Sequence, residues 1–171
     1  MEMRTLSIME TFPTALDVAR EWREDAVLSW ADMDISPSDQ LSTLSASFAF
    51  RSPSEPPVWL LIMMRATAVG METRQDEGRF EVDEPKPVGE PIDPLRLPFD
   101  TRQALEIVME NGGGQFVAQY PDIVWPLSIS LRYRDFYYSR GDLVWMGQFG
   151  DVASRATEYI YIDALTGELV D

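Results

Sequence analysis

The strongest constraint on the fold is the alternation of apolar and polar residues in several short segments. Successive side chains of a β-strand point to opposite faces of a sheet, so a period of two predicts a strand buried on one face only. Residues 45–51 follow this rule. In residues 127–134, Leu127, Ile129, Leu131 and Tyr133 alternate with Ser128, Ser130, Arg132 and Arg134. The sequence therefore predicts an antiparallel sheet with one covered face.

Further strands are expected where apolar and aromatic residues lie between turn signals such as Ser52-Pro53. The segments are residues 27–34, 58–67, 143–149 and 158–162, and residues 79–83 fit a short edge strand. The longest apolar run, residues 58–64, has seven residues, whereas a helix that crosses a bilayer needs roughly 20. No membrane-spanning segment is expected.

Two segments have apolar residues at the spacing of an amphipathic helix, and they share a similar five-residue motif. Residues 15–19 (ALDVA) and 104–108 (ALEIV) match in residue type at every position and lie 89 residues apart. Such self-similarity indicates an internal repeat. The same offset pairs Thr11 with Asp100, and both are good N-cap residues. A helix is therefore expected to begin after each of them.

The second helix carries two further signals. Asp100 followed by Gln103 is the pattern of a capping box. The three glycines at residues 112–114 are expected to end or kink the helix, and a short helical turn is expected before Tyr120.

In each half of the chain, the sequence pattern thus predicts a helix followed by strands. This order predicts an α+β protein built from two tandem helix plus antiparallel-sheet repeats, residues 1–84 and residues 99–171. Residues 85–98 are expected to be a connector, because residues 72–98 hold eight acidic residues and five of the twelve prolines. Proline lacks an N–H donor and fixes φ, so an extended, solvated spacer is expected there.

The composition excludes many reaction classes. The chain has no Cys and no His, so it lacks the usual general base, the imidazole metal ligand and every Ser-His or Cys-His pair. No cofactor is expected. An enzyme that uses carboxylates remains an alternative and would require a deep pocket with convergent polar groups. The main expectation is a non-enzymatic protein.

The charge balance bears on partners and location. Fourteen basic and 29 acidic residues give a net charge of −15, which repels phosphate backbones, so no nucleic acid partner is expected. The first residues lack the apolar core of a secretory signal. A soluble, cytoplasmic protein that does not bind membranes is the corresponding expectation.

Residues 159–170 (YIYIDALTGELV) resemble the closing hairpin of PepSY domains, in which a hydrophobic strand is followed by D-A-x-T-G-E and two apolar residues. Asp163 can hold a turn through its side chain, and Gly167 can adopt a positive φ. Together with the ALEIV helix about 55 residues earlier, the second repeat resembles a PepSY unit. Leu169 and Val170 would return the chain to the sheet.

Two such units in tandem resemble PepSY-like proteins and the β-lactamase inhibitor protein family. The resemblance implies a concave sheet surface and a non-catalytic role in binding or inhibiting peptidases or other proteins. It also implies export, which is frequent among PepSY proteins and differs from the cytoplasmic expectation.

A binding surface is predicted on the free face of the sheet. If the apolar side of residues 127–134 faces the helix, Arg132 and Arg134 lie on the other side, where neighbouring strands are expected to add Trp145 and either Tyr159 or Tyr161. Arginine and aromatic residues are enriched at protein interfaces, so a protein or peptide partner is expected. In the alternative arrangement, the sheets of the two units or the connector cover this face and bury the aromatic residues.

The runner-up function is an acidic calcium-responsive module that uses Asp32, Asp34 and Asp39. The sequence from Asp32 to Asp34 matches D-x-D, the start of an EF-hand calcium-binding loop. The pattern then departs from an EF-hand, which requires Gly at the sixth position and Glu at the twelfth, where this chain has Pro37 and Thr43.

Overall fold

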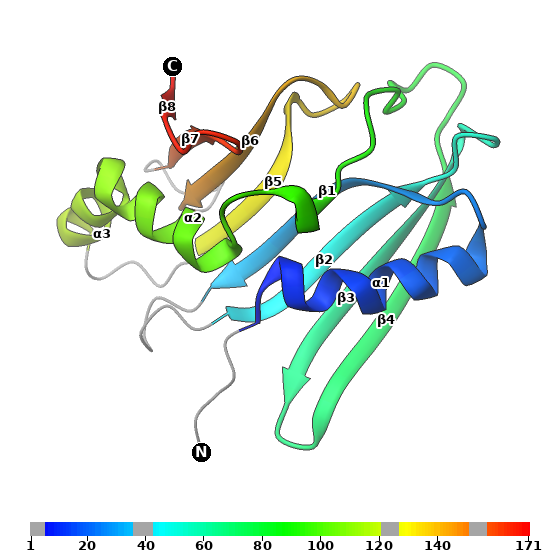
Figure 1. Cartoon of the computed structure of the whole chain (residues 1–171), viewed down its shortest axis with the longest axis horizontal. Coiled ribbons are helices and arrows are strands. Elements are labelled where there is room, and N and C mark those ends of the chain that lie inside the picture. Colours follow the sequence, from blue (N-terminus) through cyan, green and yellow to red (C-terminus); the bar gives the residue numbers. More distant parts are fainter. Residues whose placement is uncertain (1–5, 36–42, 121–126, 151–156) are drawn as a thin grey trace.

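The core of the molecule is one antiparallel sheet (Figure 1). The computed structural model describes residues 6–35, 43–120, 127–150 and 157–171. Within these residues eight strands follow the order β4-β3-β2-β1-β5-β6-β7-β8. Their bounds are β1 (Val27–Ile35), β2 (Thr43–Arg51), β3 (Val58–Thr67), β4 (Gly70–Arg79), β5 (Leu127–Asp135), β6 (Arg140–Phe149), β7 (Glu158–Asp163) and β8 (Leu169–Val170). The expected strands are present except for the edge strand at residues 79–83.

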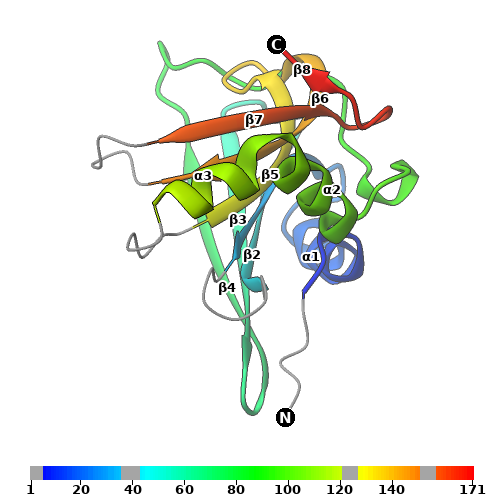
Figure 2. The same ribbon diagram turned by 90° about the vertical axis from the view of Figure 1, so that its left-hand side faces the viewer.

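The helices lie on one face of this sheet (Figures 1 and 2). They are α1 (Ile8–Trp22), α2 (Thr101–Val108) and α3 (Gly114–Gln119), with the short turns η1 (Pro94–Arg96) and η2 (Met109–Gly113) beside them. The main core lies between these helices and the sheet. For example, the ring centroid of Phe12 on α1 is 6.3 Å from that of Phe48 and 6.4 Å from that of Phe50 on β2.

The expected fold class, two tandem helix plus antiparallel-sheet repeats, is wrong. The strands on both sides of the connector form a single sheet, because β1 pairs directly with β5, with Ala31 opposite Leu131. One buried cluster also spans both halves and includes Phe48 and Ile129. The pairing removes two sheet edges whose N–H and C=O groups would otherwise face solvent. Alternation along the chain identifies the faces of a strand but does not show which strands pair.

The acidic stretch that was expected to connect the halves begins with a strand. β4 pairs with β3 along its whole length, and its charged residues are exposed almost throughout. With no face buried, the strand shows no apolar alternation, and its charges suit a sheet edge. The edge strand expected at residues 79–83 is wrong, since β4 ends at Arg79. Figure 2 shows the β3–β4 hairpin protruding from the molecule.

The start of α1 differs from its prediction. The N-cap is Ser7, whose hydroxyl oxygen accepts a hydrogen bond from the N–H of Glu10 at 3.3 Å. Thr11, the expected N-cap, lies inside the helix, and its hydroxyl donates to the carbonyl oxygen of Ser7 at 2.7 Å. Serine and threonine are both good caps, so sequence alone did not separate them.

The start and the kink of the second helical segment are confirmed. Asp100 accepts a hydrogen bond from the N–H of Gln103 at 2.9 Å, and the Gln103 side chain accepts from the N–H of Asp100 at 3.0 Å. Gly112 has a φ of 126°, which breaks the helical path, and α3 follows before Tyr120.

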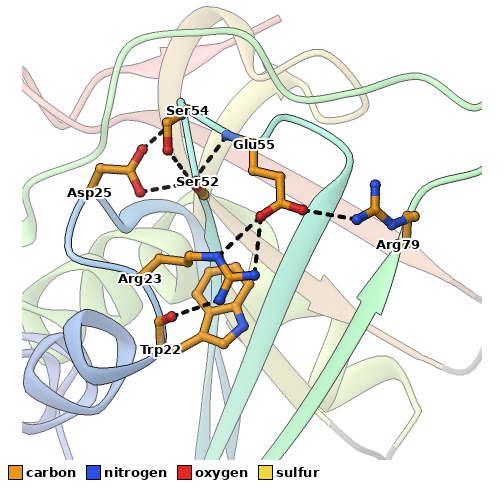
Figure 3. A network of polar contacts seen from close by, with 7 residues as sticks. All are labelled: Trp22, Arg23, Asp25, Ser52, Ser54, Glu55 and Arg79. Carbon is orange, nitrogen blue, oxygen red and sulfur yellow. Dashed lines mark hydrogen bonds and ion pairs between the residues drawn. The ribbon is translucent and has the colours of Figure 1, made fainter.

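A polar network fastens the loop after α1 to the turn between β2 and β3 (Figure 3). Glu55 accepts from Arg23 at 3.1 Å and from Arg79 on β4 at 2.9 Å. The hydrogen bond from Arg23 is the main cause that lowers the pKa of Glu55. Beside it, Asp25 accepts from the hydroxyl of Ser52 at 2.7 Å. Each charged group of this network has a hydrogen-bond partner within it, so we assign the network a structural role.

The closing hairpin folds as its residues predict. Asp163 Oδ1 accepts from the N–H groups of Leu165 and Thr166, both at 2.8 Å, and Gly167 has a φ of 74°. The chain then returns to the sheet as β8, which pairs with β7. These contacts confirm the turn chemistry, while the resemblance to PepSY domains stays a prediction.

Candidate binding face and pocket

Four of the five residues predicted to form a binding surface lie on the face of the sheet away from the helices, called the open face below. They are Arg132 and Arg134 on β5 and Tyr159 and Tyr161 on β7. Residues opposite each other in an antiparallel pair share a face. Ser130, in phase with the two arginines, lies opposite Met146, and Met146 lies opposite Tyr161. The two strands therefore present the four side chains on the same side.

Trp145 does not belong to this surface. It lies opposite Leu131 on one side and Ile162 on the other, both of which belong to the main core. Its side chain is fully buried, and its indole N–H has no hydrogen-bond partner. The register of β6 thus places Trp145 under the helices, and the sequence pattern of residues 143–149, which is apolar on both sides, did not reveal that register.

Arginine side chains near one end of the open face are stacked on aromatic rings. The pairs and their distances from guanidinium carbon to ring centroid are Arg132 with Phe136 (4.1 Å), Arg134 with Tyr161 (4.1 Å) and Arg140 with Tyr138 (4.7 Å). Arg134 also donates to the main-chain oxygen of Asp171, the last residue of the sequence, at 2.8 Å. Among the described residues, none of the three forms an ion pair with an Asp or Glu side chain. The Nε–H of Arg132 donates to the carbonyl oxygen of Tyr133 at 3.4 Å. Stacking orders each guanidinium, and its remaining N–H groups can donate to a partner.

Asp32 lies on the same face, beside these arginines. The hydroxyl of Ser130 donates to Asp32 Oδ1 at 2.5 Å. Burial raises the pKa of Asp32 to about 6, and the hydrogen bond from Ser130 and the charge of Arg132 act in the opposite direction. The carboxyl is therefore half-buried and costly to ionise.

The proposed calcium ligands are not gathered in the part of the chain that the structure covers. Asp34 accepts from the hydroxyl of Ser45 at 2.7 Å, and Asp32 is held by Ser130. Asp39 lies outside the described residues. Within residues 6–35, 43–120, 127–150 and 157–171, no group of three or more acidic side chains is placed to hold a metal ion. Calcium binding stays an untested prediction.

A pocket of about 300 Å³ adjoins the stacked arginines. Its floor is the open face of β1, β2 and β3, and its rim is formed by the connector and by the turn between β5 and β6. The walls are mainly aromatic, with Trp30, Trp59, Phe80, Phe136 and Tyr137, and Pro85 and Pro87 complete them. Arg132 stacks on the ring of Phe136. The centroid of this ring is 5.9 Å from that of Trp30. The pocket and the stacked arginines are thus continuous.

The connector is held against the sheet at the pocket rim. The N–H of Val88 donates to the carbonyl oxygen of Tyr138 at 3.0 Å, and Arg51 donates to the carbonyl oxygen of Gly89. A Cβ on Gly89 would lie 1.4 Å from the carbonyl oxygen of Ser139, so only glycine permits this approach. The connector has no strand, as expected, but it is held against the sheet and is not simply a solvated spacer. It does not bury the predicted binding residue Tyr159, which is 44% exposed.

The same segment then passes to the helix side of the sheet. Ile92 is buried in the main core, and its N–H donates to the carbonyl oxygen of Leu28 at 3.2 Å. Pro94 is also buried. The burial of Ile92 and Pro94 therefore fixes the path of the connector. The acidic composition of the segment gave no indication of this burial.

Two polar groups line the pocket without satisfied hydrogen bonds. Ser29 is 7% exposed, and its hydroxyl has no partner. It lies in a β-bulge, because the pairing of β1 with β2 shifts between Leu28 and Trp30. Arg51 is half-buried, and its Nε–H also lacks a partner. Burial lowers the pKa of Arg51, yet a guanidinium remains protonated at neutral pH.

Sequence reasoning missed this pocket, although one signal points to it. In the run of residues 58–64, Trp59 and Leu61 alternate with Leu60 and Ile62, so both faces of the strand are apolar. A strand that is apolar on both faces is typical of burial on both sides. The structure places Leu60 and Ile62 in the main core and Trp59 and Leu61 at the pocket.

Comparison with known proteins gives a likeness of fold. No family model matches the chain, and no curated protein matches its sequence. A solved structure described as a "putative lipoprotein" from Clostridium difficile 630 is similar, with a TM-score of 0.51 over 94% of this chain and 90% of that one. The identity is 9%, so the similarity shows the fold alone.

None of the helices in the described residues is long and apolar enough to cross a membrane.

Proposed function

We propose that this protein is a non-enzymatic module that binds an acidic segment of a protein or peptide on its open face. The supporting observation is the set of three ring-stacked arginines that form no ion pair with an Asp or Glu side chain among the described residues. In a chain with 29 acidic residues and a net charge of −15, such a local group of unpaired cations is a distinctive feature. Arginine and tyrosine are also the residues that most often anchor protein interfaces.

The chemistry of these side chains defines the partner. A guanidinium that is held flat on a ring can donate two parallel hydrogen bonds to one carboxylate, which a lysine cannot do. Tyr159 is 44% exposed and Tyr137 is 68% exposed, so aromatic surface lies beside the cations. The partner segment is therefore expected to combine Asp or Glu with apolar residues. The PepSY resemblance adds peptidases as one class of partner to test.

The test is selection from a random peptide display library on the immobilised protein. Wild type is expected to enrich peptides that contain acidic residues, and isothermal titration calorimetry then gives their affinity. The variant Arg132→Gln/Arg134→Gln is expected to weaken binding by at least about tenfold, since each lost charge-assisted contact is worth about 1.5–3 kcal/mol.

The matched control is Arg96→Gln/Arg102→Gln. It makes the same change in net charge at two exposed arginines, on η1 and α2. This control is expected to bind as wild type does, and thermal unfolding checks that both variants are folded. Equal loss in the two variants would show a general charge effect. That result, or the absence of any enriched acidic peptide, would overturn the proposal.

A further inference from the structure

We propose that the pocket between strands β1–β3 and the connector binds a small, planar aromatic carboxylate. This site adjoins the ring-stacked arginines and shares Phe136 with them, but its occupant is a small molecule rather than a peptide. The inference does not depend on the proposed function, because it stands on a separate cavity with its own cation, Arg51.

The shape of the pocket favours a flat, apolar body. Its volume of about 300 Å³ lies at the lower end of the range for small-molecule sites. Trp30, Trp59 and Phe136 supply ring faces and edges, and Pro85 adds a rigid rim. Flat rings pack against one another in offset or edge-to-face geometry, which an aromatic ligand matches better than a branched one.

The polar groups define the other end of the ligand. The hydroxyl of Ser29 and the Nε–H of Arg51 are buried donors that have no protein acceptor among the described residues. A buried donor without an acceptor destabilises the protein. A ligand that places an acceptor next to these two residues would therefore gain the free energy of the hydrogen bonds that it forms with them. The ligand is therefore expected to carry an acceptor group at the Ser29 and Arg51 end.

The charge of Arg51 makes that acceptor an anion. This side chain is half-buried, and its hydrogen bond goes to the neutral carbonyl oxygen of Gly89. Among the described residues it forms no ion pair. A partly desolvated guanidinium without a counter-charge interacts more strongly with a carboxylate than with a neutral acceptor.

The probe is 2-naphthoate, and the comparison ligand is methyl 2-naphthoate, which keeps the rings and removes the charge. Calorimetry and saturation-transfer NMR measure binding of each ligand to the full chain. The expected result is binding of 2-naphthoate that is at least about tenfold tighter than binding of the ester. Arg51→Met is expected to abolish this difference, and Ser29→Ala is expected to weaken 2-naphthoate binding severalfold.

The matched control is Arg23→Met. Arg23 also lies over a tryptophan, at 5.0 Å from the ring of Trp22, and it lines another hollow of about 280 Å³. This control is expected to retain binding. If Arg51→Met does not fold, Ala49→Leu fills the pocket from β2 and is expected to prevent binding of both ligands.

Three results would overturn the inference. They are no binding of 2-naphthoate at millimolar concentration, equal affinity for the acid and the ester, and unchanged binding by the folded Ala49→Leu variant. Loss of binding in Arg132→Gln/Arg134→Gln but not in Arg51→Met would place the ligand on the stacked arginines instead, and would also reject this site.

Discussion

At the scale of single residues, Asp32 is the group whose ionisation most affects the fold. It lies on the open face of the central strand β1, and burial raises its pKa to about 6 from an ordinary 3.8. In that interval of pH the folded chain keeps a proton that the unfolded chain releases. The free energy of unfolding therefore falls as pH rises from about 4 to about 6, and the loss is complete above that range.

Asp32→Asn is accordingly expected to stabilise the protein at pH 7 to 8. The gain is about 3 kcal/mol at most, because each pKa unit corresponds to about 1.4 kcal/mol and the amide can still accept from Ser130. Urea unfolding at several pH values between 4 and 8 measures it. The comparison variant Asp34→Asn changes an exposed carboxylate on the same strand and is expected to give no such gain. A less stable Asp32→Asn variant at pH 8 would contradict this account.

At the scale of elements, features that depend on a few neighbouring residues were predictable. The capping box at Asp100, the kink at Gly112 and the Asp163 turn are each decided within about six residues, and the structure confirms them. The position of the proposed binding residues was predictable in part, because alternation along β5 fixes the side of the sheet on which Arg132 and Arg134 lie. The prediction was wrong for Trp145. The side of the sheet on which each residue of β6 lies depends on the register of β6 with β5, a strand that the sequence pattern does not identify as its partner.

The capping box gives an element-scale prediction. Asp100→Ala removes the acceptor for the N–H of Gln103 and is expected to lower the free energy of unfolding by about 1 kcal/mol. Thermal and urea unfolding measure the change. Thr11→Ala serves as the comparison, because Thr11 lies inside α1 and Ser7 caps that helix. It is expected to cost less than Asp100→Ala. The reverse order would contradict the assignment of the helix starts.

At the scale of the whole molecule, strand order could not be predicted. Alternation and turn residues predicted the positions of most strands. The pairing of β1 with β5 joins residues about 100 positions apart, and no local sequence pattern indicates it. The pocket was missed for a similar reason. Its walls come from three strands, the connector and the β5–β6 turn, and only the fold brings Ser29, Arg51 and Phe136 together.

The continuous sheet predicts that both halves unfold together. Because one core spans β2 and β6, their amides are expected to exchange with solvent through a common opening as urea increases. Native-state hydrogen exchange measures this. Separate openings for β2 and β6, with clearly different free energies, would show that residues 1–84 and 99–171 are independent units.

The central claim is recognition by the stacked arginines of the open face. The most direct measurement is an NMR titration that follows the arginine Nε–Hε signals while an enriched acidic peptide is added. The account predicts that the signals of Arg132 and Arg134 shift and saturate with the binding curve, while those of Arg96 and Arg102 do not move. Shifts confined to Arg96 and Arg102, with Arg132 and Arg134 unchanged at saturation, would contradict it.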